Sequence, residues 1–282
     1  MIVNNKFTIV PFSSSLQEEI FTILSNGPIN GNDLLNTIAS KYPTTKQGVY
    51  KALRKLLDDE IIIKNEKFFS LNTVWLSRFS DFIEKSEINL GAILPFSDNS
   101  PYQRKVINFK NTEALDIYWG HLFLTITRIF KSEPIFFYNH HSWFIHERPH
   151  SEKYLYNISL KKSQKILITI GVKTTIAQKF KEDFTKNNIQ IAIDETFPIL
   201  KSDHLCIVGD YFIITRYSSE TSSKINSLFK KATAFGETET KELHKILLNC
   251  KKPKIIITKN YSKANVWKHK LAKNFVIKKS EL

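Results

Sequence analysis

Residues 44–71 constrain the fold of this chain most, because a helical pattern runs directly into two short strand-like runs. Thr44 is followed three residues later by Gln47, which fits the capping box that starts a helix. Apolar residues then recur at the spacing of one helical face, at Val49, Ala52, Leu53, Leu56 and Leu57. Strand-like runs at 61–64 and 68–71 flank the turn residues 65–67. This order predicts a recognition helix followed by its wing.

Two further helical patterns precede this stretch. The first covers 13–26, begins at serines that can cap it, and ends at Asn26-Gly27-Pro28. The second has Asn32 as its expected cap and ends at Tyr42-Pro43. Three short helices followed by a hairpin are the order of a winged helix-turn-helix domain, which we assign to residues 1–90. A fourth helix is expected over 74–85, where it would connect two domains or form a dimer contact.

The outward face of the third helix and of the hairpin carries basic and hydrogen-bonding side chains. Phosphates attract lysine and arginine, while glutamine, threonine and arginine can pair with base edges. The predicted DNA-contacting residues are Thr44, Thr45, Lys46, Gln47, Tyr50, Lys51, Arg54, Lys55, Lys64 and Lys67. The alternative is an ordinary solvated helix face, and Tyr50 either contacts DNA or packs on the wing. Caps, spacing and wing occur together, which favours DNA binding.

The formal net charge of +14 favours a polyanionic partner or an acidic surface. Residues 251–282 hold ten lysines and one acid, Glu281, so their side chains contribute 10 − 1 = +9. This basic C-terminal helix is either a second DNA contact or soluble surface. Two cysteines and no Cys-x-x-Cys exclude a disulfide framework and a cysteine metal site. The N-terminal residues do not fit a signal peptide, and no run approaches the ~20 apolar residues of a membrane span, so we expect a cytoplasmic protein without a membrane partner.

Residues 91–104 are rich in turn-forming residues and predict a linker between two domains. Beyond it, strand-like and helical patterns alternate, which predicts an α/β domain with a mixed sheet over 105–282. The expected strands cover 135–138, 143–145, 165–170, 189–193, 204–208, 211–216 and 254–258, and the expected helices cover 112–130, 174–188, 221–231, 238–248 and 262–275. The fold class is α+β or α/β, with the winged helix-turn-helix domain in front.

Half of the eight histidines lie within residues 140–150, at His140, His141, His146 and His150. Residues 146–150 match His-Glu-x-x-His, in which one helix presents both histidines to a metal. Because Pro149 lies between these histidines, and proline inside a helix costs about 3 kcal/mol, we do not expect a metalloprotease. Two alternatives stay open: the four histidines line an anion or metal pocket, with Trp143 and Arg148 among them, or they make ordinary hydrogen bonds. We assign the six residues to ligand binding and expect no metal. No Walker A, G-x-G-x-x-G or G-x-S-x-G pattern is present, and no cofactor is expected.

Residues 13–85 resemble the N-terminal domain of TrmB-type transcription regulators, through Leu34 and Leu35 and the stretch KQGVYKALRKLLDDEII at 46–62. The resemblance implies that the third helix enters the major groove and that the protein works as a dimer. The rest of the chain faintly resembles phospholipase D-like α/β domains, whose catalytic pattern is His-x-Lys followed by an aspartate. No His-x-Lys triplet occurs in this chain, so the resemblance implies a catalytically inactive domain that senses a ligand or dimerises.

Two functions are consistent with these patterns. The first is a sequence-specific DNA-binding transcription regulator, not an enzyme, that binds double-stranded DNA as a homodimer and whose C-terminal domain senses a small-molecule effector or dimerises. The second is a nucleic-acid-processing or defence enzyme that docks through the winged helix and has its active site at the histidine cluster.

Overall fold

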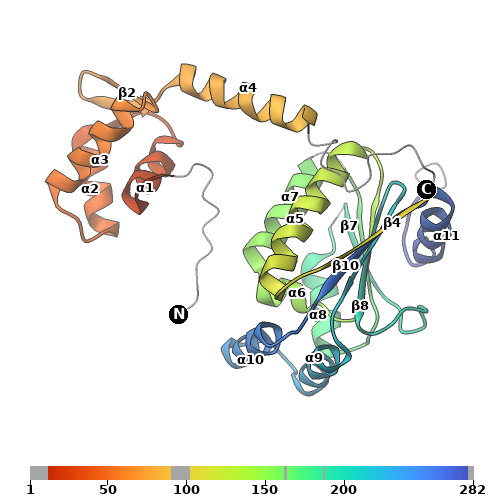
Figure 1. The fold of residues 1–282 in the computed structure, drawn as a ribbon. Coiled ribbons are helices and arrows are strands. Elements are labelled where there is room, and N and C mark those ends of the chain that lie inside the picture. The colour runs from red at the N-terminus through yellow and green to blue at the C-terminus, as the bar shows by residue number, and fades with distance from the viewer. Residues whose placement is uncertain (1–11, 90–101, 162–163, 187, 279–282) are drawn as a thin grey trace. The chain divides into compact units, whose positions relative to one another are not determined.

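The computed structural model describes residues 12–89, 102–161, 164–186 and 188–278. The chain divides into two compact units, Met1–Asn89 and Leu90–Leu282, which Figure 1 shows in red to orange and in yellow to blue. Among the described residues, no helix combines the length and the apolar character needed to cross a membrane.

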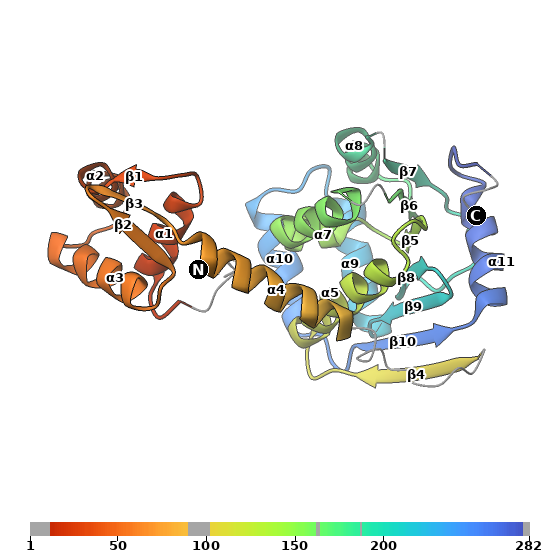
Figure 2. The same cartoon turned by 90° about the horizontal axis from the view of Figure 1, so that it is seen from above.

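The first unit has the element order of a winged helix-turn-helix domain (Figure 2). Its helices are α1 (Ser15–Leu24), α2 (Gly31–Lys41), α3 (Lys46–Asp58) and α4 (Thr73–Asn89), and its strands are β1 (Ile29–Asn30), β2 (Ile62–Asn65) and β3 (Phe68–Leu71). The strands form an antiparallel sheet in the order β1-β3-β2, with Asn65 paired to Phe68 across the turn. The predicted helices and wing are therefore confirmed, whereas the short strand β1 was not expected.

Two of the predicted helix caps are wrong by one or two residues. Helix α3 is capped by Thr45, whose Oγ1 accepts a hydrogen bond from the Gly48 backbone N–H at 3.1 Å. The predicted box of Thr44 and Gln47 does not form, because Gln47 then stands at the second position of the helix rather than the third. Helix α2 is capped by Asn30 rather than Asn32, because β1 ends at Asn30 in an extended conformation and its side-chain Oδ1 accepts a hydrogen bond from the Asn32 N–H at 3.0 Å.

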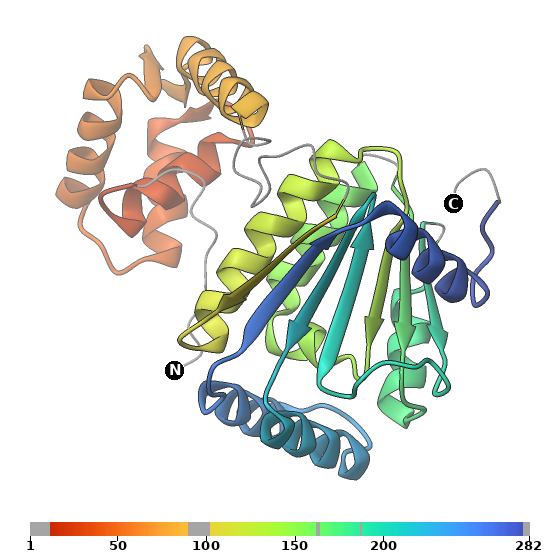
Figure 3. The same ribbon diagram turned by 45° about the vertical axis from the view of Figure 1, so that its right-hand side comes forward.

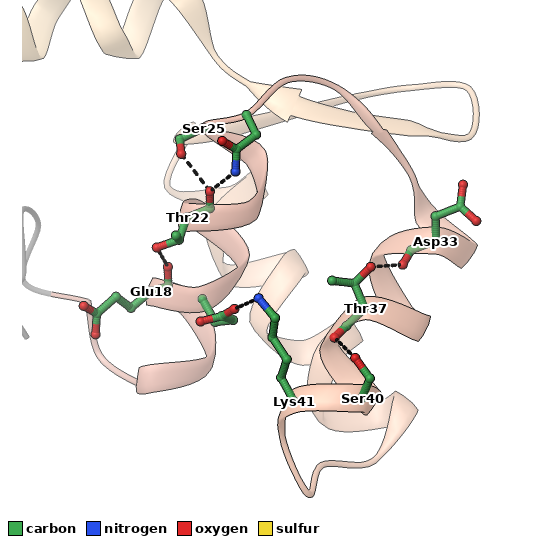
Figure 4. A network of polar contacts seen from close by, with 9 residues as sticks. Glu18, Thr22, Ser25, Asp33, Thr37, Ser40 and Lys41 are labelled. Carbon is green, nitrogen blue, oxygen red and sulfur yellow. Dashed lines mark hydrogen bonds and ion pairs between the residues drawn. The ribbon is translucent and has the colours of Figure 1, made fainter. Parts of the chain in front are cut away.

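The core of the first unit joins the three helices to the hairpin through fully buried side chains such as Ile20, Leu34 and Leu56. On the outside, Lys41 at the end of α2 pairs with Glu19 of α1 at 3.0 Å (Figure 4). Hydroxyl groups on these two helices donate to carbonyls of their own helix, as Figure 4 shows for Thr22 and Thr37. The hydroxyl groups drawn on α1 and α2 are thus engaged within their own helices, through the backbone carbonyls of residues such as Glu18 and Asp33.

The second unit is built on a seven-stranded mixed sheet in the order β4-β10-β9-β8-β5-β6-β7 (Figure 3). Strands β5, β6 and β7 are parallel, and the other neighbours pair antiparallel. The strands are β4 (Gln103–Asn108), β5 (Ile135–Asn139), β6 (Ile166–Ile170), β7 (Ile189–Ile193), β8 (Asp203–Val208), β9 (Tyr211–Arg216) and β10 (Lys254–Lys259). The helices are α5 (Thr112–Ile129), α6 (Trp143–Glu147), α7 (Pro149–Lys161), α8 (Thr175–Phe184), α9 (Ser219–Lys231), α10 (Glu237–Leu248) and α11 (Tyr261–Ala272). The predicted mixed sheet is confirmed.

Helices cover both faces of this sheet. One core cluster lies between the sheet and helices α5, α7 and α8, and includes Leu122, Phe123 and Ile168. A second cluster lies between the other face and α11, and includes Phe136, Leu205 and Leu271. A third cluster packs α6 against α9 and α10. Because β5 and β6 are covered on both sides, all five residues of each strand are buried, which explains why their only polar residues are Asn139 and Thr169.

Three expectations for the second unit differ from the structure. Residues 143–145, expected as a strand, begin helix α6, since a run of three apolar residues is too short to show a period. Helix α7 was not expected, and Pro149 is its first residue, where the missing N–H costs nothing. Residues 103 and 104 of the predicted linker belong to β4, because Gln103 and Arg104 pair with Lys259 and Thr258 of β10. Linker residues 91–101 lie outside the described residues.

Gly209 in the turn between β8 and β9 supports a pair of stability predictions. It adopts φ +55°, and a Cβ built there would overlap the ring of Phe130. Gly209→Ala should lower the free energy of unfolding by about 2–3 kcal/mol, because an αL alanine and a ring clash are combined. Gly120→Ala in α5, where a Cβ meets nothing within 4 Å, should instead add about 0.5–1 kcal/mol. Urea unfolding of both variants measures these changes in the free energy of unfolding. Equal changes in the two variants would contradict the left-handed conformation and the close contact with Phe130 at Gly209.

Candidate DNA-binding face and ligand pocket

The predicted DNA-contacting side chains of α3 lie on the side of the helix opposite its buried residues. Val49, Leu53 and Leu56 are buried, whereas the exposed residues are Thr45, Lys46, Gln47, Tyr50, Lys51, Arg54 and Lys55. Thr44 is half-buried. The helix therefore presents a continuous polar face, which we name the α3 face and define by Lys46, Gln47, Lys51 and Arg54.

The four residues of the α3 face are not engaged by their own unit. Lys46, Gln47, Lys51 and Arg54 make no side-chain hydrogen bond or ion pair with any described residue, so their polar groups face solvent. Lys55 differs, because its Nζ pairs with Asp59 Oδ1 at 2.8 Å, and this hydrogen bond raises the pKa of Lys55. The positive charge that is free to meet a polyanion thus lies in the first two-thirds of the helix.

The wing adds two exposed lysines to this unit. Lys64 of β2 stands 5.8 Å above the ring centre of Phe69, and Lys67 lies in the turn. Glu66 occupies the left-handed region at φ 52°, which closes the two-residue loop between Asn65 and Phe68. Phe68 at the start of β3 is half-exposed. The wing therefore combines positive charge with an exposed ring.

In the second unit, the four clustered histidines lie in different environments. His140 and His141 are buried, with ring centres 4.6 Å apart, and His141 Nε2 lies 3.1 Å from Asn226 Oδ1 of α9. His146 of α6 stacks on Phe235 at 4.2 Å. His150 in the first turn of α7 is exposed. Within the parts of the chain that the structure describes, no three His, Cys, Asp or Glu side chains are placed to hold a metal ion.

A cavity of about 60 Å³ lies beside this cluster, and two of the six predicted ligand-binding residues belong to its surroundings. Trp143 lines it directly, and Arg148 pairs with Asp116 of the lining at 2.9 Å. The cavity is bordered by α5, α6, α7 and by residues of β5, β8 and β9, and it is open on one side. Its lining consists of Leu115, Asp116, Trp119, Phe137, Asn139, Trp143, Phe144, Glu152, Tyr156, His204, Leu205, Thr215 and Tyr217. We name this cavity the α5–α7 pocket.

The pocket lies at the carboxyl end of β5, next to the point where the sheet changes from parallel to antiparallel strands. Strand β5 pairs parallel with β6 and antiparallel with β8, and the last residue of β5, Asn139, lines the pocket. In open α/β sheets, ligands bind at the carboxyl ends of strands where the strand order reverses. The position of the pocket is therefore that of a ligand site.

A chain of hydrogen bonds fixes one wall of the pocket. Trp143 Nε1 donates to His204 Nε2 at 3.3 Å, so the proton of the neutral imidazole is on Nδ1, which donates to Asn139 Oδ1 at 3.0 Å. Burial lowers the pKa of His204 to about 3, which keeps the ring neutral at physiological pH. Both ring nitrogens are occupied, so His204 holds Trp143 and Asn139 in place and has no free nitrogen for proton transfer.

Two carboxyl groups line the pocket, Asp116 of α5 and Glu152 of α7. Burial raises the pKa of Asp116 to about 6, although the guanidinium of Arg148 opposes this shift. Burial also raises the pKa of Glu152 to about 7, and the hydroxyl of Tyr156 donates a hydrogen bond to it. Glu152 has no arginine or lysine as a direct partner among the described residues. The negative charge of Glu152 is therefore less well balanced by a nearby cation than that of Asp116, which pairs with Arg148.

The sequence patterns did not single out Asp116, Glu152, His204 or Tyr217, which lie up to about a hundred residues apart along the chain. Asp116 is a polar residue within the apolar helix α5, and this was the signal that could have identified it.

Comparisons with family models and with curated proteins gave no match for this chain. Among solved structures, it is similar to TrmBL2, an archaeal chromatin protein reported with a novel mode of DNA binding, with 10% identity and a TM-score of 0.33 over 92% of this chain and 91% of that one. It is also similar to NucT from Helicobacter pylori, with 9% identity and a TM-score of 0.34 over 61% of this chain and 95% of that one. At such low TM-scores, neither similarity assigns a function.

The raised pKa of Glu152 predicts how stability depends on pH. The folded protein holds this proton up to about pH 7, whereas the unfolded chain releases it near pH 4.5, so ionisation of the desolvated Glu152 carboxyl lowers stability as pH rises through that window. Glu152→Gln should therefore match the wild type in free energy of unfolding at pH 5 and exceed it by about 2–3 kcal/mol at pH 8. Urea unfolding at both pH values checks this. Glu242→Gln, on the exposed side of α10, is the control, and the same pH-dependent gain in both variants would contradict the prediction.

Proposed function

We propose that this chain is a sequence-specific DNA-binding transcription regulator, in which α3 enters the major groove and the second unit binds an effector. The observation that carries the proposal is the α3 face, where Lys46, Gln47, Lys51 and Arg54 are exposed and engage no described residue. Selecting bound fragments from genomic DNA with the purified protein tests it. Recovery of a shared sequence supports the proposal, and recovery of random fragments contradicts sequence specificity.

The α3 face has the chemistry that a DNA groove requires. Its cations neutralise phosphates and release counterions, and Gln47 can pair with the N6 and N7 atoms of an adenine edge. The three acids Asp58, Asp59 and Glu60 follow at the other end of the helix, where they do not oppose the approach of phosphates to Lys46 or Lys51. The net charge of +14 adds long-range attraction to a polyanion.

The second unit acts in this proposal by binding rather than by catalysis, and the protein is cytoplasmic. The sequence holds no His-x-Lys triplet, and both nitrogens of His204 in the α5–α7 pocket are occupied by Trp143 and Asn139. An enzyme that processes nucleic acids through the histidine cluster is the competing function. Turnover of a phosphodiester substrate that is lost on His141→Ala would favour that competing function.

The proposal includes a homodimer, because α4 carries exposed apolar side chains beyond its contact with the first unit. Trp75 stacks on Phe79 and meets Phe21, whereas Phe82 is 65% exposed and Ile83 is 41% exposed. A two-fold dimer would present two α3 helices to half-sites about one helical turn apart, roughly 34 Å.

Sedimentation of the purified protein tests the dimer. The wild type should sediment with twice the mass of one chain, and Phe82→Glu should shift it to a monomer, because a charge would be buried in the α4 contact. Ile117→Glu, at an exposed position on α5, is the control and should remain dimeric. A monomeric wild type would contradict the dimer, and a dimeric Phe82→Glu variant would contradict the role of α4.

Removal of charge from the α3 face should change the salt dependence of DNA binding. Lys51→Ala with Arg54→Ala should weaken binding and reduce the slope of log K against log salt by about 1.8, because two fewer phosphates are neutralised. The matched control is Lys179→Ala with Lys181→Ala, which removes two exposed cations from α8. Titration of a labelled DNA fragment at several salt concentrations measures both slopes. An unchanged slope in a folded α3 variant would mean that this face does not contact phosphates.

Gln47 is free to read a base because Thr45 supplies the helix cap. Gln47→Ala should leave thermal stability unchanged and reduce discrimination at one base position by about 1–3 kcal/mol. Thr45→Ala should show the opposite, a loss of about 1 kcal/mol of stability with the base preference retained. Thermal unfolding and binding to operators substituted one position at a time separate these effects. A Gln47→Ala variant with unaltered base preference would remove Gln47 from the reading residues.

A further inference from the structure

We propose that the α5–α7 pocket binds the ammonium head group of a small organic cation. This inference rests on the proposed function and deepens it, because it names the chemical class of the effector. It draws on the charge of the lining, the aromatic rings around it, the polar groups left without partners, and the size of the cavity.

The lining is acidic in a strongly basic chain. Asp116 and Glu152 both line the pocket, and the lining holds no lysine or arginine, although the chain has a net charge of +14. Arg148 lies outside the lining and forms its ion pair with Asp116, so it attracts Glu152 only at longer range, and this attraction is weaker than the effect of burial. A cation that enters the pocket would supply the missing positive charge. An anion would meet two carboxyl groups and a neutral His204.

Aromatic rings form much of the remaining lining. An ammonium group near a ring face is attracted by the negative charge of the π-system, and cages of such rings recognise alkylammonium ligands. Six of the lining residues are aromatic, and they come from α5, β5, α6, α7 and the segment after β9: Trp119, Phe137, Trp143, Phe144, Tyr156 and Tyr217. Rings on several sides of two carboxyl groups suit a cation better than a hydrated anion.

Polar groups in the lining remain free to meet a ligand. Tyr217 is 4% exposed, and its hydroxyl has no hydrogen bond to another residue in the described part of the chain. Its oxygen can accept one ammonium N–H, and the carboxylates of Asp116 and Glu152 can accept the other two.

The size of the cavity limits what enters it. A cavity of about 60 Å³ holds a few water-sized groups, since one water needs roughly 10–15 Å³. A primary ammonium with one or two carbons fits, and a longer substituent would extend toward the open side of the pocket. A nucleotide base or a hexose ring exceeds this volume. The pocket therefore selects for a head group rather than for a whole large ligand.

Binding of a cation must be linked to proton release, because the carboxyl groups are partly protonated in the free protein. The pKa of Asp116 is raised to about 6 and that of Glu152 to about 7, and an ammonium requires both in the charged form. The other titratable groups that act on them come from the neighbouring segments: Glu147 of α6, Arg148, Tyr156 of α7, His204 of β8 and Tyr217. Affinity for a cation should therefore rise as pH increases from 5.5 to 8.

Calorimetric titration of the full-length protein in the absence of DNA tests the proposal. Ethylammonium chloride should bind at pH 8, and its Kd should be at least about tenfold weaker at pH 5.5, because both carboxyl groups must first lose protons. Sodium propionate, inorganic phosphate and glucose, titrated in the same way, should not bind. Glu152→Gln and Asp116→Asn should each weaken the binding of ethylammonium by tenfold or more, and Glu242→Gln should leave it unchanged.

Three results would overturn the inference. They are binding of phosphate or propionate in preference to ethylammonium, binding of glucose alone, or equal ethylammonium affinity in the wild type and both pocket variants. Loss of folding does not confuse the test, because Glu152→Gln removes a destabilising buried charge. The DNA titration is separate, so a protein that binds ethylammonium but no DNA would refute the proposed regulator and leave the pocket assignment intact.

Discussion

The burial of β5 on both faces is the constraint on which the second unit depends. Its five residues are all buried, and it stands between parallel β6 on one side and antiparallel β8 on the other. Such a strand requires helices on both faces, since otherwise its apolar side chains would meet water. Helices α5 and α7 cover one face, and α11 covers the other. Strand β5 ends at Asn139, and this residue lines the α5–α7 pocket, which the covering helices do not fill.

The same packing places ionisable groups where their charged forms are unfavourable. Asp116 and Glu152 keep their protons to unusually high pH, and His204 stays neutral to unusually low pH, in each case because burial disfavours the ion. Hydrophobic residues of similar size would stabilise the fold more. Groups that lower stability and line one cavity are typical of a site where binding, rather than folding, requires them.

In the first unit, the hydrogen bond from the Gly48 N–H to Thr45 Oγ1 fixes where helix α3 begins. Thr45 caps α3, which leaves Gln47 in the first turn with its side chain in solvent. The buried face of α3 is held by Val49, Leu53 and Leu56 against α1 and the hairpin. Lysine and arginine are confined to the other face because burial of an unpaired charge would cost far more than its exposure. The burial of one face of α3 therefore accounts both for its apolar core contacts and for the position of its charged residues on the opposite face.

The sequence by itself determined the winged helix-turn-helix unit and the mixed sheet, because apolar spacing reports directly which face of an element is buried, but it missed β1, β4 and α7. It also excluded a continuous helix through His146 and His150, since Pro149 cannot stand inside one. Only the tertiary structure decided that Thr45 rather than Thr44 caps α3, and that Trp143 begins a helix, because local patterns one residue apart are nearly equal in energy. The pocket was likewise a tertiary result: Asp116, Glu152, His204 and Tyr217 come from four segments, and only the packing of the helices on the sheet brings them together.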